Sequence, residues 1–263
     1  MLVDFHTHLD QYDEKSLALA VDCIVQNKIL TLSASCAIDS WRKNLEIAKR
    51  APAFIIPTFG VHPSYCKNLP QNEGELSAFL EPYFSSSAII GEIGLDFEWE
   101  TEIPHETQET VFLCCLDHCH RNKKFAVIHT KGAEARICEI LRDFPDAKPI
   151  IHWYDGDEKS FRTFCERGFY QTFGCEVRYS ERIQRFLNMT PAELLLSETD
   201  NPTGEPWLCE KRGITNIDNS PLLIRRVVSD MAKVKNIKES EMEAILEANA
   251  QRILLEARGF TQK

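Results

Sequence analysis

Short apolar runs alternate with longer amphipathic stretches along this chain of 263 residues. The runs are rich in β-branched, aromatic and other large apolar residues and are too short for helices, so they predict buried strands. Eight strands are predicted in this way, at residues 2–5, 29–33, 54–59, 88–93, 125–128, 149–151, 169–173 and 194–196.

The stretches that follow these runs carry apolar residues at three- and four-residue spacing, which is typical of amphipathic helices. Helices are predicted at 15–26, 40–50, 106–119, 133–141, 220–233 and 238–257. Eight strand-then-helix units in a chain of this length predict an α/β fold, a TIM (β/α)8 barrel, in a single domain over residues 1–263. An open doubly wound sheet is the alternative, although the sequence has neither glycine-rich phosphate loop, GxGxxG or GxxxxGK(S/T).

Composition and charge narrow the classes of function. With 43% hydrophobic residues the chain can bury a substantial core, and no apolar run reaches the roughly 18 residues of a membrane span. The N-terminus has no basic segment and no long apolar core, so we expect no signal peptide and a cytoplasmic location. The net charge of −10 opposes binding of nucleic acid through a broad basic surface. An anionic substrate would therefore be held locally, by metal ions and a few cations.

The ten cysteines are scattered and form no CxxC pair, which favours reduced structural thiols over disulfides. A single cluster imitates a zinc knuckle, but its spacing favours the surface of a helix that ends in the basic run 121–124. This cluster consists of Cys114, Cys115, His118, Cys119 and His120.

Side chains that bind metals recur where the predicted strands end. In a parallel barrel the functional groups gather at the carboxyl ends of the strands, and five of the eight histidines lie there. Imidazole nitrogens and carboxylate oxygens are ligands of zinc, manganese and iron. The candidates are His6, His8, His62, Glu92, His129, His152, Glu198 and Asp200.

Several of these residues can be given metal-binding roles. His6 and His8 would point the same way from the first strand, because side chains alternate along a strand. We place Glu92 between two metal ions, since each carboxylate oxygen can bind one; a salt bridge inside the barrel is the alternative. His129 and His152 end neighbouring strands and would share the second ion, although each alone is compatible with a satisfied core histidine.

The remaining candidates are assigned more loosely. Asp200 would bind the first ion or the water that this ion activates. If the eighth strand continues this far, Glu198 and Asp200 would lie on the same face of it. Glu198 would then orient a histidine ligand from outside the coordination shell. His62 lies before a proline on a loop, where it would contact a phosphate or donate a proton, or would simply stiffen the loop.

Four aromatic residues follow predicted strand ends, namely Trp99, Trp153, Tyr154 and Trp207. Such side chains stack on unpaired bases in proteins that bind single-stranded nucleic acids. Packing residues that close the mouth of the barrel are an equally good interpretation.

Five motifs occur along the chain in the order Asp4-x-His6-x-His8, Gly60-x-His62-Pro63, Gly91-Glu92-Ile93-Gly94-Leu95-Asp96, the pair His129 and His152, and Glu198-Thr199-Asp200-x-Pro202. Together they resemble the TatD family of metal-dependent deoxyribonucleases, and the later Asn249-Ala250-x-Arg252 resembles its terminal helix. The resemblance implies a TIM barrel with two divalent ions, Mg, Zn or Mn, and a DNA substrate that is often cut from a 3′ end.

By that match, His6, His8, Glu92 and Asp200 would hold one ion, and Glu92, His129 and His152 would hold the other. His62 and Glu198 would support catalysis or contact the substrate. The sequence departs from the family around the phosphate. Lys131 stands where relatives usually have arginine, the segment 97–100 is acidic, and Trp153 follows His152 in place of cysteine. Lys131 or Arg212 would neutralise the phosphate, with Trp153 as a further substrate contact.

The sequence therefore predicts a hydrolase that cleaves DNA phosphodiesters with metal-activated water, as a 3′–5′ exonuclease on single-stranded DNA. One alternative keeps the metals but hydrolyses an amide or lactone of a small molecule, because the charge is acidic and the phosphate side is altered. Another is a nuclease subunit of a multiprotein DNA-defence assembly, with protein partners unknown.

Overall fold

The computed structural model describes residues 1–215 and 218–261. Eight strands lie in these residues, and each overlaps one of the predicted apolar runs. They are β1 (Val3–Thr7), β2 (Leu30–Ala34), β3 (Ile55–Thr58), β4 (Ile90–Asp96), β5 (Phe125–Lys131), β6 (Lys148–Ile151), β7 (Tyr170–Phe173) and β8 (Leu195–Ser197).

Helices follow the strands, and all six predicted helices are present. The helices are α1 (Glu14–Asn27), α2 (Ile38–Arg50), α3 (Glu73–Ser86), α4 (His105–Asn122), α5 (Glu134–Ile140), α6 (Glu158–Glu166), α7 (Glu181–Met189), α8 (Gly204–Arg212), α9 (Leu223–Lys235) and α10 (Glu239–Thr261). A 3₁₀ helix, η2 (Pro63–Asn68), follows β3. In the described residues, none of the helices has the length and hydropathy needed to cross a membrane.

The strands β4 and β5 continue furthest beyond the ends of their predicted apolar runs. Every residue of β4 and β5 is buried, and the parallel ladder between them extends through the pairs Gly94–His129, Leu95–Thr130 and Asp96–Lys131. The predicted ends at residues 93 and 128 are therefore three residues too early. The polar residues beyond these predicted ends, among them Asp96, His129 and Lys131, are buried in the sheet.

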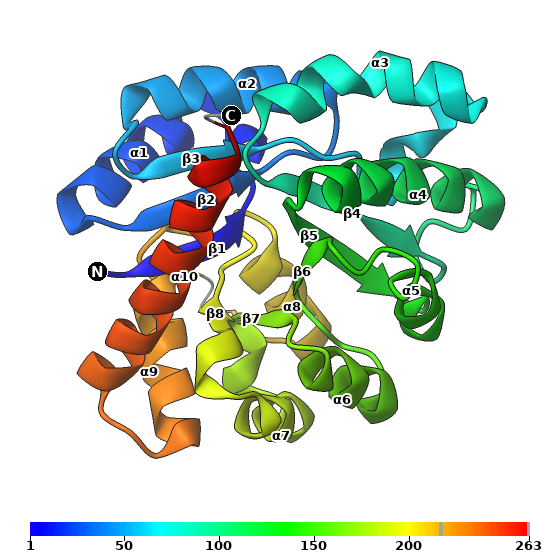
Figure 1. The fold of residues 1–263 in the computed structure, drawn as a ribbon. Helices are drawn as coiled ribbons and strands as arrows, with labels where there is room; N and C mark the ends of the chain where they lie inside the picture. Colours follow the sequence, from blue (N-terminus) through cyan, green and yellow to red (C-terminus); the bar gives the residue numbers. More distant parts are fainter. Residues whose placement is uncertain (216–217, 262–263) are drawn as a thin grey trace. The chain divides into compact units, whose positions relative to one another are not determined.

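The chain divides into two compact units, and the first comprises Met1–Ser33, Lys43–Pro57 and Gln171–Arg252. Within it, β1 pairs in parallel with β2, and β7 pairs in parallel with β8 (Figure 1). The strands β1 and β8 lie side by side, and the Ser197 hydroxyl donates a hydrogen bond to the Val3 carbonyl at 2.6 Å. Helices α7 and α9 pack together in the same unit.

The second unit comprises Ala34–Arg42, Thr58–Tyr170 and Ile253–Lys263, of which residues 262–263 lie outside the described part. Its strands β4, β5 and β6 are paired in parallel, and α4 packs against β4 with α3 beside it (Figure 1). The prediction of a single domain, which also covers the undescribed residues 216–217 and 262–263, stays a prediction.

The cluster that imitated a zinc knuckle lies on α4, as its spacing predicted. Cys115, His118 and Cys119 are buried, and burial raises the pKa of the Cys119 thiol to about 12. His118 Nδ1 lies 3.3 Å from the Glu81 carboxylate on α3. All ten cysteines are free thiols. These side chains therefore join α4 to the core and to α3.

Candidate metal centre

His6, His8 and Asp200 come together in the first unit and form what we call the N-terminal cluster. His6 lies in β1, His8 follows that strand, and Asp200 follows β8. The Asp200 backbone N–H donates to the His6 carbonyl at 3.0 Å, which holds the two strand ends together. The Nε2 atoms of the two histidines are 3.2 Å apart, and they lie 3.6 Å (His6) and 3.2 Å (His8) from Asp200 Oδ1.

The two spacings of 3.2 Å match those between ligands of one metal ion, and the His6–Asp200 spacing is slightly longer. Two ligand atoms bound at about 2.1 Å, at angles of about 90° to 109°, are separated by about 3.0 to 3.4 Å. Two imidazoles facing one carboxylate also form a donor set that suits zinc, manganese or iron. The N-terminal cluster therefore fits a divalent cation.

Buried polar side chains support the N-terminal cluster from behind. Asp4 accepts hydrogen bonds from the Thr199 backbone N–H at 3.0 Å and from the Thr199 hydroxyl at 2.7 Å. Burial raises the pKa of the Asp4 carboxyl to about 8, although the Thr199 hydrogen bonds oppose this. These bonds join β1 to the segment that carries Asp200.

Glu198 is fully buried in the same unit, and its backbone N–H donates to the Phe173 carbonyl at 3.0 Å. The strand β8 ends at Ser197, and Asp200 has a left-handed backbone with φ of 51°. The strand does not persist, so the expected shared face of Glu198 and Asp200 does not arise. The role of Glu198 stays a prediction.

Glu92 lies at the centre of a second group of ligands, which belongs to the second unit; we call it the Glu92 cluster. Its members are Glu92, His62, His129 and His152. Three imidazole nitrogens face Glu92 Oε1, at 3.0 Å for His129 Nδ1, 3.1 Å for His152 Nε2 and 3.7 Å for His62 Nε2. The two shorter spacings again match neighbouring ligands of one ion.

The charge of Glu92 is stabilised by these rings. Burial alone raises the pKa of its carboxyl, but His62, His152 and the hydrogen bonds from His129 and His152 together hold that pKa well below its usual value. Glu92 is therefore a carboxylate, and a proton or a metal ion can occupy the position that it shares with His129 Nδ1. The donor set fits a divalent ion here too. The bridging of two ions by Glu92 stays a prediction.

Asp96 holds the other side of the His129 ring, a function that the sequence did not indicate. Its Oδ2 lies 3.1 Å from His129 Nε2, and its Oδ1 accepts the backbone N–H groups of Glu98 and Trp99 at 3.1 and 2.7 Å. Because a carboxylate only accepts, His129 Nε2 carries the proton and Nδ1 is left to bind a metal. Burial raises the pKa of Asp96, but these hydrogen bonds outweigh it and lower the pKa.

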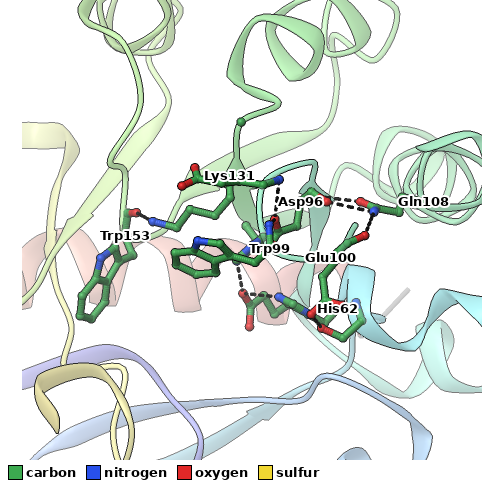
Figure 2. A network of polar contacts seen from close by, with 12 residues as sticks. His62, Asp96, Trp99, Glu100, Gln108, Lys131 and Trp153 are labelled. Atoms are coloured by element: carbon green, nitrogen blue, oxygen red, sulfur yellow. Dashed lines mark hydrogen bonds and ion pairs between the residues drawn. The ribbon is translucent and has the colours of Figure 1, made fainter. Parts of the chain in front are cut away.

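Gln108 on α4 clamps the Asp96 backbone. Its Oε1 accepts the Asp96 N–H at 2.9 Å, and its Nε2 donates to the Asp96 carbonyl at 2.9 Å and to the Glu100 carbonyl at 3.3 Å (Figure 2). Gln108 thus fixes both ends of the segment that begins at Asp96. Its place within a helical run hid this role in the sequence.

His62 is attached to Glu100 through a serine. Its Nδ1 lies 2.8 Å from the Ser64 hydroxyl oxygen, and that hydroxyl is hydrogen-bonded to the Glu100 carboxylate (Figure 2). The ring also caps η2, since Nδ1 accepts the Ser64 backbone N–H at 3.2 Å. These bonds orient His62 Nε2 towards Glu92. No pattern in the sequence indicated these roles of Ser64 and Glu100.

The predicted substrate contacts lie in different surroundings. The Lys131 ammonium lies 3.4 Å from the Trp153 carbonyl and 4.9 Å from the centre of the Trp99 ring. Trp153 is buried and offers its backbone here. Arg212 is exposed at the end of α8, where its guanidinium donates to the Tyr179 carbonyl at 3.3 Å and lies over the Tyr179 ring. The role of each towards a substrate stays a prediction.

Comparison with known protein families identifies relatives over almost the whole chain. Residues 3–255 match the family described as TatD related DNase. The metal-dependent hydrolase MG009 of Mycoplasma genitalium is 28% identical over 95% of this chain and 97% of its own length. "Putative deoxyribonuclease tatdn3-B" of Xenopus laevis is 26% identical over 96% of this chain and 94% of its own length.

Solved structures show the same fold. A TatD family hydrolase from Entamoeba histolytica matches 96% of this chain and 97% of its own with a TM-score of 0.79 at 18% identity. The TatD homologue YJJV from Escherichia coli matches the same shares with a TM-score of 0.76 at 18% identity. A TIM-barrel protein from Bordetella bronchiseptica matches with a TM-score of 0.66 at 16% identity, over 97% of this chain and 99% of its own. The predicted α/β, TIM-barrel fold is thus confirmed. The chain belongs to the TatD-related DNase family and is a metal-dependent hydrolase.

Proposed function

We propose that this hydrolase cleaves phosphodiester bonds of DNA, with single-stranded DNA cut from the 3′ end as the preferred substrate. The observation that carries the proposal is the pair of clusters, in each of which imidazoles face one carboxylate oxygen at spacings typical of metal ligands. The relatives with deoxyribonuclease in their names support DNA as the substrate.

Each cluster would hold one divalent ion, Mg, Zn or Mn. His6, His8 and Asp200 would hold one ion, and Glu92, His129 and His152 would hold the other. Divalent ions at such sites lower the pKa of bound water and stabilise the charge on a displaced phosphate oxygen.

The side chains outside the coordination shell would have separate tasks. His62, held by Ser64, would contact the phosphate or protonate the leaving oxygen through its Nε2 atom. Asp96 would keep the His129 ring in the tautomer that binds metal. Lys131 would add positive charge beside the Glu92 cluster.

A small-molecule amide or lactone is the second candidate substrate. The acidic residues Glu98 and Glu100 border the exposed Trp99 beside the Glu92 cluster, and the chain carries a net charge of −10. A polyanion has to overcome this repulsion, whereas a neutral molecule does not.

Digestion of end-labelled DNA tests the proposal. The purified protein is stripped of metal, reloaded with Mg, Mn or Zn, and incubated with single- and double-stranded DNA and with a panel of amides and lactones. We expect shortening of single strands from the 3′ end, and no detectable cleavage by Glu92→Gln, because the neutral amide cannot replace the carboxylate. Exposed Glu166→Gln on α6 is the control and retains activity.

Two further measurements complete the test. Elemental analysis of the loaded protein is expected to give two ions per chain, and circular dichroism establishes that Glu92→Gln is folded. Cleavage of DNA by Glu92→Gln at the wild-type rate would contradict the proposal. Turnover of an amide or lactone, with intact DNA, would favour the second candidate.

A further inference from the structure

Trp99 is the most exposed of the four aromatic residues that follow predicted strand ends, Trp99, Trp153, Tyr154 and Trp207. Trp153 and Tyr154 follow β6 and are only 5% and 4% exposed, so they pack in the core. Trp99 follows β4 and is 45% exposed. A single exposed aromatic residue is ordinary, so its surroundings decide whether it has a function.

The indole of Trp99 lies beside proposed metal ligands. Its ring centre is 6.4 Å from that of His129, in an edge-to-face arrangement. The Lys131 ammonium lies over the indole at 4.9 Å from its centre (Figure 2). A cation in this position is attracted to the ring face and restricts its orientation. The exposed ring therefore has a defined place next to the Glu92 cluster.

The backbone of Trp99 is tied to the same cluster. Its N–H donates to Asp96 Oδ1 at 2.7 Å, while Asp96 Oδ2 lies 3.1 Å from His129 Nε2. Two residues earlier, the Phe97 backbone N–H donates to the Lys131 carbonyl at 2.8 Å. One carboxylate thus holds both the backbone of Trp99 and the His129 ring.

We propose that Trp99 is a stacking platform for an unpaired nucleobase, which it positions so that the adjoining phosphodiester reaches the Glu92 cluster. The inference rests on the proposed function and makes it more specific. Every base has a flat apolar face, so stacking on tryptophan selects unpaired nucleotides over a duplex without selecting a sequence. The surface around Trp99 is acidic, because Glu98 and Glu100 flank it, and uncharged stacking can provide affinity there.

The test combines a change in the protein with a change in the substrate. KM and kcat are measured for wild type, Trp99→Ala and Trp99→Phe on a single-stranded oligonucleotide and on one with abasic tetrahydrofuran nucleotides at both ends. We expect Trp99→Ala to raise KM for the normal strand roughly 5- to 100-fold, and Trp99→Phe to restore part of the loss. On the abasic strand, the variants and wild type should have the same KM.

Phe79→Ala is the matched control, because Phe79 on α3 is 44% exposed and its ring contact is with Tyr83 of the same helix. It should leave both substrates unaffected. An equal loss on normal and abasic strands would show that Trp99 only packs, and would overturn the inference while DNA cleavage stands. The inference is also overturned if Trp99→Ala leaves KM unchanged for both the normal and the abasic strand.

A binding measurement separates this inference from the proposed function. Tryptophan fluorescence is followed while a phosphorothioate single strand, which resists cleavage, is added to wild type and to Trp99→Phe. Saturable quenching that Trp99→Phe loses supports the platform, even if the wild type cleaves no DNA with any metal. If neither cleavage nor quenching occurs, both proposals fall.

Discussion

At Asp96, the two oxygens of one carboxylate serve two neighbours, the His129 ring and the backbone of the segment 98–99. Histidine ligands commonly donate their second ring N–H to such a carboxylate, which fixes the tautomer and makes the other nitrogen more basic. Asp96 therefore links the metal chemistry to the shape of the adjoining loop.

The change Asp96→Asn tests the link to the metal. We expect it to weaken binding of the ion at the Glu92 cluster about 10- to 100-fold, because an amide holds the ring less well and can present a donor to it. Isothermal titration of the metal-free protein with Mn²⁺ or Zn²⁺ measures the effect, with Glu166→Gln as control. Wild-type affinity in Asp96→Asn would contradict the assignment.

The roles of single residues were only partly predictable from the sequence. His6, His8, Glu92, His129 and His152 are visible because metal-ligating residue types recur at the ends of apolar runs. Asp96 was part of a quoted motif, but its role depends on the pairing of Gly94 with His129, which brings the carboxylate beside the ring. Ser64 and Gln108 act through contacts between elements that no spacing in the sequence encodes.

At the scale of elements, the close approach of β4 and β5 positions Glu92 and His129. Gly94 makes this approach possible, since a Cβ atom there would lie 2.0 Å from the His129 carbonyl oxygen. Gly91 meets the same strand, because its Cβ would lie 2.6 Å from the Val127 Cβ. Glycine at these positions lets the two backbones come together.

We expect Gly94→Ala to lower the free energy of unfolding by about 3 kcal/mol, because a backbone oxygen cannot move aside without disturbing the sheet. Urea denaturation measures the change. Gly74→Ala is the control: its Cβ would meet only the Asn72 side chain, at 3.4 Å, and alanine there favours the α3 helix. Equal stability of Gly94→Ala and wild type would show that β4 and β5 separate easily.

Lys124 joins the end of α3 to the start of β5. Its buried ammonium donates to the carbonyls of Phe84 and Ser87 at 2.6 and 2.7 Å. Burial lowers the pKa of Lys124, so holding the charge there has a cost that these hydrogen bonds offset.

Lys124→Met keeps the length of the side chain but leaves both carbonyls without this donor. We expect it to lower the free energy of unfolding by about 2–3 kcal/mol. The neighbouring exposed Lys123→Met removes the same charge and is the control for thermal and urea unfolding. If both variants lose the same amount, the buried hydrogen bonds contribute little.

The elements themselves were largely predictable, and their ends were not. Strands buried on both faces carry continuous apolar runs, and these were found in all eight places. β4 and β5 continue through Asp96 and Lys131, because the backbone ladder persists after the apolar runs have stopped at residues 93 and 128. In contrast β8 ends at Ser197, because the chain turns into the left-handed conformation at Asp200.

At the scale of the whole molecule, metal binding should appear as stability. Ions that bind only the folded protein stabilise it by about 4 kcal/mol at 1,000 times their dissociation constant. For a chain of this size, this raises the midpoint of thermal unfolding by roughly 10 °C.

We therefore expect EDTA to lower the melting temperature and added Mn²⁺ or Zn²⁺ to restore it, as measured by differential scanning calorimetry. The restoration should be smaller in His6→Ala and in Glu92→Gln, since each variant loses a ligand of one cluster. Glu166→Gln should respond like wild type. An identical response of all variants would place the stabilising ions elsewhere.

The attachment of Asp96 to backbone N–H groups has a consequence for how such an enzyme can be altered. Every amino acid except proline supplies that donor, so the side chains at positions 98 and 99 can be exchanged without detaching the loop from Asp96 or disturbing His129. New side chains at these two positions would then give the same hydrolytic machinery a different preference for what it cuts, while Glu100 keeps its hydrogen bond to Ser64 beside His62.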